Sequence, residues 1–263
     1  MYLNAHSYYS LRYGTFSVEK LVEAARQRKV ETMALTDINN SSGMIDFVKE
    51  CNEQGIKPIG GMEIRNRDEL LFTGIARNNE GFRELNAYMS AINLGENEYT
   101  ETAPEFSNVF VIYPFGDKFS RKLKENEFIG VKPSQARKLI TRTAGDFSKM
   151  IIQQPVTFSD EKSYYLHKNL RAIDHNLLLS HLKPGMFARP DETFLSPETI
   201  RKTFARYPSV IENTEKLTDG CKIDFDYNSI KNKKTFTGSR YDDRILLEKL
   251  TYDGLKYRFG ENN

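Results

Sequence analysis

The fold is decided by two stretches of the sequence, Leu3-Asn4-Ala5-His6-Ser7 and Ala34-Leu35-Thr36-Asp37-Ile38-Asn39. Each predicts a short buried strand that ends in polar residues. Between them, residues 17–25 carry apolar side chains at the spacing of one helix face, and the hydroxyl of Ser17 is suited to cap the first turn. The pattern predicts a strand–helix–strand unit. In parallel α/β proteins, the ends of such strands carry the ligand site.

Further segments continue this alternation of strands and helices. Strands are expected at residues 56–64, 70–76, 108–113, 127–131 and 149–154, which makes seven with the first two. Helices are expected between most of them, one ending at Gly55, and Ser196 is expected to cap a later helix. Seven strands with intervening helices favour a closed or nearly closed parallel barrel, and an open sheet is the alternative.

The composition excludes several classes of protein. With 38 basic and 36 acidic residues the net charge is +2, so no global field draws the chain to nucleic acid. No apolar run approaches the ~18 residues of a membrane helix, and no secretory signal pattern opens the sequence. Cys51 and Cys221 lie far apart in sequence and are expected to be buried thiols in a reducing compartment. We therefore expect a cytoplasmic protein.

Several blocks of the sequence together resemble the N-terminal region of bacterial DNA polymerase III alpha subunits. The blocks are residues 5–11, 34–37, 55–63, 76–82, 194–198, 207–214 and 254–260. Residues 105–149 match poorly, and their role is left open. The resemblance implies a PHP (polymerase and histidinol phosphatase) domain, a distorted TIM-like (β/α)7 barrel, over residues 1–185. Residues 186–263 would then be a helical connector leading toward the polymerase palm, which itself is absent.

Intact members of this family hold several metal ions at the strand ends through histidines and carboxylates. The resemblance places His6, Asp37 and Glu63 at such positions, where they would hold at most one weakly bound Zn, Mn or Mg ion. The other ligand positions appear as lost. They are Asn4, Tyr13, Ile38 and Leu71, with Pro155 and Thr157 at two later ones.

The surviving residues are expected to be a hydrogen-bonded remnant rather than a working site. Asparagine in place of a histidine at position 4 offers only a neutral carbonyl, a poor substitute for imidazole on zinc. We expect His6 to pair with Asp37, and Asp37 to brace the turn at residues 39–40. The remaining histidines lack the i, i+4 spacing of a ligand pair and are expected to be surface or partly buried helix residues. They are His167, His175 and His181.

Two functions from different classes follow. The first is the PHP region of a DNA polymerase III alpha subunit, a DNA-directed DNA polymerase (nucleotidyltransferase) that uses Mg in DNA replication. This segment would have no catalytic residues of its own and would be a structural support and a docking surface for a proofreading exonuclease. Its partners would be the rest of the polymerase chain and, through that chain, DNA. Whether the parent polymerase is the main replicase or a repair paralogue stays open. The alternative is a metal-dependent phosphoesterase or 3′–5′ exonuclease of the PHP family with a reduced metal site.

Overall fold

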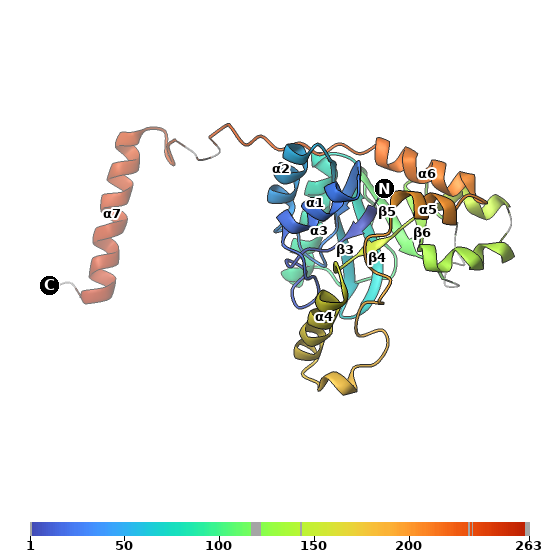
Figure 1. The fold of residues 1–263 in the computed structure, drawn as a ribbon. Coiled ribbons are helices and arrows are strands. Elements are labelled where there is room, and N and C mark those ends of the chain that lie inside the picture. Colours follow the sequence, from blue (N-terminus) through green and yellow to red (C-terminus); the bar gives the residue numbers. More distant parts are fainter. Residues whose placement is uncertain (1, 117–121, 143, 231, 233, 261–263) are drawn as a thin grey trace. The chain divides into compact units, whose positions relative to one another are not determined.

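The computed structural model describes residues 2–116, 122–142, 144–230, 232 and 234–260. The chain divides into two compact units, Met1–Phe225 and Asp226–Asn263. The first unit contains a curled sheet of eight strands flanked by helices (Figure 1). The strands are β1 Tyr2–Ala5, β2 Thr32–Leu35, β3 Lys57–Asn66, β4 Glu69–Ala76, β5 Val109–Pro114, β6 Glu127–Val131, β7 Met150–Ile152 and β8 Pro155–Val156.

The strand order explains how the predicted barrel is realised. Neighbouring strands follow the order β7-β6-β5-β4-β3-β2-β1-β8, so the sheet curls around an interior, and the predicted α/β, TIM-like architecture is confirmed. The expectation that all strands are parallel was wrong, because β4 runs antiparallel to both β3 and β5. Only Arg67 and Asp68 separate β3 from β4, and such a short connection permits a hairpin but no parallel crossover. The short β8 is an additional strand that pairs with β1.

The helices begin and end largely where local sequence signals predict. In the first unit they are α1 Val18–Gln27, α2 Met44–Gln54, α3 Asn79–Asn93, α4 Glu161–Asp174, α5 Pro197–Thr203 and α6 Pro208–Asp219, with 3-10 helices η1 Pro133–Thr141, η2 Ala144–Lys149 and η3 Leu179–His181. The Ser17 side chain accepts a hydrogen bond from the backbone N–H of Lys20 and caps α1. Gly55 ends α2 with a φ of 71°, a conformation that glycine adopts without a steric penalty.

The interior of the curled sheet is apolar below the strand ends. Leu3, Ala34, Ile59, Ile75, Ile112 and Ile151 are buried there, together with Leu217 of α6 and Cys221. The hydroxyl of Thr214 in α6 accepts a hydrogen bond of 2.8 Å from the backbone N–H of Ile152 in β7. Residues 186–225 therefore belong to the same compact unit as the sheet. The boundary expected at residue 185 from the family resemblance lies inside this unit and stays a prediction.

The second unit contains one long helix, α7 Arg240–Phe259, which Ser239 caps through a hydrogen bond from the N–H of Asp242. None of the residues in α7 is buried. Across the described ranges of both units, no helix combines the length and the apolar character needed to cross a membrane.

Candidate functional site

The predicted site residues lie on three adjacent strands, two of them just past a carboxyl end. His6 follows β1, Asp37 follows β2, and Glu63 lies in β3, where it forms an isolated parallel bridge with Ile38. At most 1% of the surface of each of the three residues is exposed. The curled sheet thus brings together side chains that are far apart in sequence, as the strand–helix–strand pattern predicted.

Glu63 is held by three side chains, from β1, from the residue that follows β1, and from β3 itself. Its Oε2 accepts a hydrogen bond of 2.6 Å from the Asn4 amide, and the Nε2 of His6 lies 3.3 Å from the same oxygen. Its Oε1 accepts from the Nε of Arg65 at 2.5 Å. Burial alone would raise the pKa of Glu63, but the charge of Arg65, the His6 ring and the Asn4 hydrogen bond hold that pKa well below its usual range. Glu63 is therefore an ionised carboxylate that is paired within the protein.

Arg65 is itself held by Tyr13. The Cζ atom of Arg65 lies 4.4 Å from the centre of the Tyr13 ring, and its Nη2 donates a hydrogen bond of 3.1 Å to the Tyr13 hydroxyl. Burial raises the pKa of Tyr13 well above its usual range, so the phenol stays protonated at neutral pH. The guanidinium thus lies between a carboxylate and an aromatic ring, an arrangement that suits the planar arginine head group.

Asp37 has a different set of partners from those expected. Its Oδ1 accepts from the Ser7 backbone N–H at 2.7 Å and from the Ser10 hydroxyl at 2.6 Å, and its Oδ2 accepts from the Ser7 hydroxyl at 2.7 Å. The expectations that Asp37 pairs with His6 and braces the turn at residues 39–40 were therefore wrong. Asp37 instead fixes the loop after β1, because the short serine side chains of that loop reach the carboxylate. Burial raises the pKa of Asp37, although the hydrogen bonds from Ser10 and Ser7 act in the opposite direction.

His6 begins a chain of polar contacts across the strand ends. Its Nδ1 lies 3.0 Å from the Thr157 hydroxyl, which in turn lies 3.4 Å from the Oε2 of Glu192. The Nζ of Lys132 forms an ion pair of 2.9 Å with the other oxygen of Glu192. The sequence analysis missed Arg65, Glu192 and Lys132. Only Arg65 carried a usable signal, since it lies two residues after Glu63 in the same strand.

This arrangement does not fit a multi-metal centre. Such a centre needs several ligands directed at common points, with open positions for water and substrate. Within the described part of the chain, no group of three or more His, Cys, Asp and Glu side chains is placed to hold a metal ion. Both carboxylates already have partners within the protein. Asp37 accepts hydrogen bonds from Ser7 and Ser10, and Glu63 accepts them from Arg65 and Asn4.

The positions at which the family resemblance placed lost ligands take several structural roles. Asn4 and Tyr13 contact the Glu63–Arg65 pair, and Thr157 contacts His6. Leu71 is buried in an apolar cluster with residues of β3, β4 and α3, and Pro155 lies in β8. Ile38 lines a pocket beside the site.

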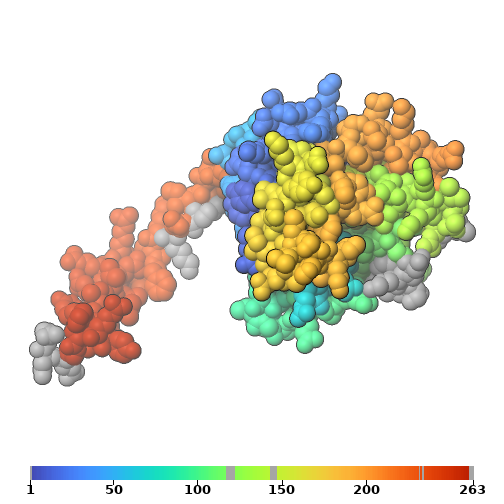
Figure 2. Space-filling model, turned by 60° about the horizontal axis from the view of Figure 1, so that its bottom comes forward, coloured from blue at the N-terminus to red at the C-terminus, as the bar shows by residue number. Residues whose placement is uncertain are grey.

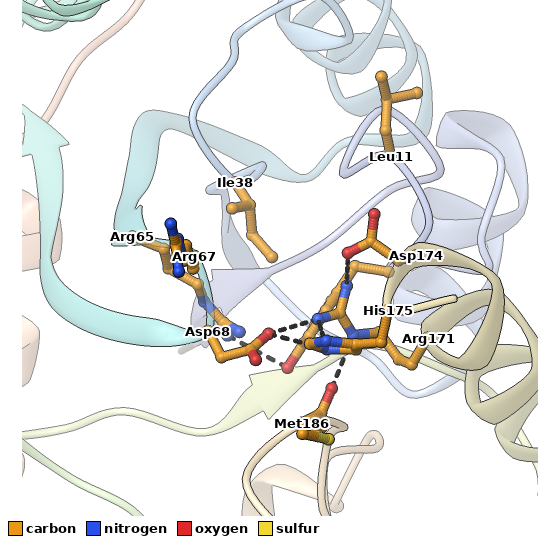
Figure 3. A pocket seen from close by; sticks show the side chains of 10 residues that line it. Leu11, Ile38, Arg65, Arg67, Asp68, Arg171, Asp174, His175 and Met186 are labelled. Atoms are coloured by element: carbon orange, nitrogen blue, oxygen red, sulfur yellow. Dashed lines mark hydrogen bonds and ion pairs between the residues drawn. The ribbon is translucent and has the colours of Figure 1, made fainter. Parts of the chain in front are cut away.

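That pocket has a volume of about 460 Å³ and brings α4 against the β3–β4 turn (Figure 3). It is lined by Leu11, Tyr13, Ile38, Arg65, Arg67, Asp68, Arg171, Asp174, His175 and Met186. Arg171 of α4 forms ion pairs with Asp68 at 2.5 Å and with Asp174 at 2.7 Å, and donates to the Met186 carbonyl at 2.7 Å. The buried Arg171 therefore fastens α4 to the strand ends. Figure 2 shows the yellow and gold surface of α4 and the following residues across this face of the first unit.

The later histidines do not join the site as ligands. His167 of α4 is fully buried, not at the surface or partly buried as expected, because both ring nitrogens find backbone partners. Its Nδ1 lies 2.7 Å from the Tyr13 carbonyl oxygen, and its Nε2 accepts from the Ala188 N–H at 2.8 Å. His175 lies in the Arg171 network, 3.3 Å from Asp68, and His181 is exposed.

Comparison with known protein families agrees with this fold. The model of the PHP domain matches residues 3–179, which include His6, Asp37, Glu63 and Arg65. The chain belongs to the PHP domain family. The compact unit that contains the matched residues continues to Phe225.

Similar proteins are bacterial DNA polymerases. The PHP chain is 25% identical over 297 residues to the DNA polymerase III subunit alpha of Halalkalibacterium halodurans, covering 99% of this chain and 26% of that protein. It is 32% identical over 116 residues to the corresponding subunit of Staphylococcus aureus strain COL, covering 42% of this chain and 11% of that protein. It is 21% identical over 312 residues to an error-prone DNA polymerase of Symbiobacterium thermophilum, covering 99% of this chain and 28% of that protein. The chain thus spans about a quarter of the length of the relatives that it matches end to end.

Proposed function

We propose that this chain is the PHP region of a bacterial DNA polymerase III alpha subunit and acts as a structural support without hydrolytic chemistry of its own. The similarity to polymerase chains over nearly the whole sequence supports the first part. The observation that carries the second part is the pairing of Glu63 with Arg65 and Asn4. Both oxygens of this carboxylate already have a donor from the protein, so neither is left open to bridge two metal ions.

Three side chains at the site are also held away from the role of a general acid or base. Glu63 stays ionised and paired, and the Tyr13 hydroxyl stays protonated at neutral pH. Asp37 uses its oxygens to fix the loop after β1. A general acid or base needs access to substrate as well as a suitable pKa. Glu63, Tyr13 and Asp37 are all buried, so none of the three has this access.

A hydrolysis assay tests this function. The purified chain is incubated with p-nitrophenyl phosphate, and separately with single-stranded DNA labelled at its 5′ end, in the presence of Zn²⁺, Mn²⁺ or Mg²⁺. We expect no cleavage above that of the variant Glu63→Gln. Cleavage that the unchanged chain performs and this variant loses would favour the alternative, a metal-dependent phosphoesterase or exonuclease.

The proposal also includes the partners of the support. The PHP region would contact the rest of the polymerase chain and offer a docking surface for a separate proofreading exonuclease. We expect the exonuclease subunit from the same organism to co-elute with the chain in size-exclusion chromatography. Separate elution at micromolar concentrations of both proteins would refute the proposed docking surface. It would not affect the proposed structural support of the polymerase chain.

A further inference from the structure

We propose that the Arg65 guanidinium is a built-in cation that takes the place of a divalent metal ion at Glu63, so that the protein's own side chain closes the site to metal. This inference rests on the proposed function, since it explains why a PHP domain can keep Glu63 without metal chemistry. It goes further in two ways. Arg65 is named as the residue that replaces the metal, and a cation site is predicted at Glu63 in a variant that lacks the Arg65 guanidinium.

The first observation is the charge that Glu63 requires. Only 2% of its side chain is exposed, and a lone carboxylate buried to that degree needs a cation or several hydrogen-bond donors. A metal ion would meet this need in a hydrolytic site. Here the Nε of Arg65 meets it from a distance of 2.5 Å.

The second observation is that two residues at lost ligand positions contact this same ion pair. Asn4 donates to the Glu63 oxygen that Arg65 does not use. Tyr13 offers its ring face and its hydroxyl to the guanidinium, at 4.4 Å and 3.1 Å. A tyrosine binds a guanidinium well and is no ligand for a hydrated divalent cation. Asn4, Tyr13 and Arg65 therefore form one matched set around Glu63.

The third observation is a pair of unsatisfied polar atoms beside Glu63. Within the described residues, the Oδ1 of Asn4 is buried without a hydrogen-bond partner, and the buried Nε2 of His6 has only a contact of 3.3 Å with the Oε2 of Glu63. An amide oxygen and an imidazole nitrogen are both metal-binding atoms. Removal of the guanidinium would free the Oε1 of Glu63, while Asn4 and His6 contact its Oε2. We expect the freed carboxylate, the amide oxygen and the imidazole nitrogen to serve as a donor set for one Zn²⁺ or Mn²⁺ ion.

The test compares Arg65→Ala with Arg67→Ala, a matched control two residues later. Arg67 is exposed, and the described residues contain no ion pair to it. Each protein is dialysed against Zn²⁺ or Mn²⁺, and bound metal is measured by mass spectrometry. We expect about one equivalent in Arg65→Ala and less than about a tenth in Arg67→Ala and in the unchanged chain. Metal should also raise the Tm of Arg65→Ala alone, by about 4 °C or more at saturation.

Further variants cover the case in which Arg65→Ala does not fold. Arg65→Lys keeps a cation and should fold without binding metal. The double variant Glu63→Gln with Arg65→Ala removes both charges, so it should fold and show no response to metal. If this double variant or added metal restores folding that Arg65→Ala lacks, the uncompensated Glu63 is the cause, as proposed.

Two outcomes would overturn the inference. One is a folded Arg65→Ala that binds no more metal than Arg67→Ala. The other is a misfolded Arg65→Ala that neither metal nor the double variant rescues. Either result would leave the proposed function standing if the unchanged chain is free of metal. Metal binding by the unchanged chain would instead overturn the proposed function, whatever the variants do.

Discussion

The contribution of the Glu63–Arg65 pair to stability can be predicted from its burial. The exposed fractions of the two side chains are 2% and 12%, so the pair is shielded from solvent. Removing one partner of such a pair costs about 3–5 kcal/mol, because the other charge is left buried and uncompensated. Glu63 would keep the hydrogen bond from Asn4. We therefore expect Arg65→Ala to lower the free energy of unfolding by about 3 kcal/mol in EDTA, the lower end of that range.

A double-mutant cycle separates the pair from the rest of the site. Glu63→Gln, Arg65→Ala and the double variant are unfolded in urea, followed by circular dichroism because the sequence has no tryptophan. The double variant should be more stable than the sum of the single losses implies, with a coupling energy of about 2 kcal/mol. An Arg65→Ala loss below about 1 kcal/mol, or strictly additive losses, would refute this account of the pair.

Three further predictions concern the surroundings of the site. Arg171→Met removes the ion pair to Asp68 and the other contacts that fasten α4, so the free energy of unfolding should fall by about 2–3 kcal/mol in urea titrations. An unchanged free energy of unfolding would contradict the role of Arg171. Thr214→Val keeps the side-chain shape but leaves the Ile152 N–H without its acceptor, so the free energy of unfolding should fall by about 1–3 kcal/mol. Equal urea midpoints for the variant and the unchanged chain would disprove this prediction. Burial lowers the pKa of His167 to about 4 from 6.5, so the unfolded chain takes up the proton first as pH falls, and stability should decline by about 1.4 kcal/mol per pH unit between those values. His167→Gln should show a shallower decline, and an identical pH dependence would contradict the assignment.

Local signals in the sequence predicted most elements of the fold. Ser17, Gly55 and Ser196 act at helix ends as expected, because capping depends on residues only a few positions away. The direction of β4 was missed, although the two-residue connection at Arg67 and Asp68 is visible in the sequence. Strand direction depends on pairing between segments, which periodicity alone does not report.

The site was predicted in its residues but not in its contacts. The resemblance singled out His6 and Glu63, and the structure places them 3.3 Å apart, after β1 and within β3, with β2 between these two strands in the sheet. Their roles as remnants of a metal site stay a prediction. The pairing of Asp37 with Ser7 and Ser10 depends on the path of a loop, which the sequence pattern does not specify. Glu192 lies in an irregular segment between η3 and α5 and gave no periodic signal.

The central claim is that the site at Glu63 and Arg65 operates without metal. Its most direct test is the metal content of the unchanged chain, measured by mass spectrometry after dialysis against zinc, manganese and magnesium. The account predicts less than about a tenth of an equivalent of any transition metal under every condition. About one equivalent or more would contradict it. About two or more would mean that the side chains around Glu63 rearrange into a metal centre of the kind used for hydrolysis.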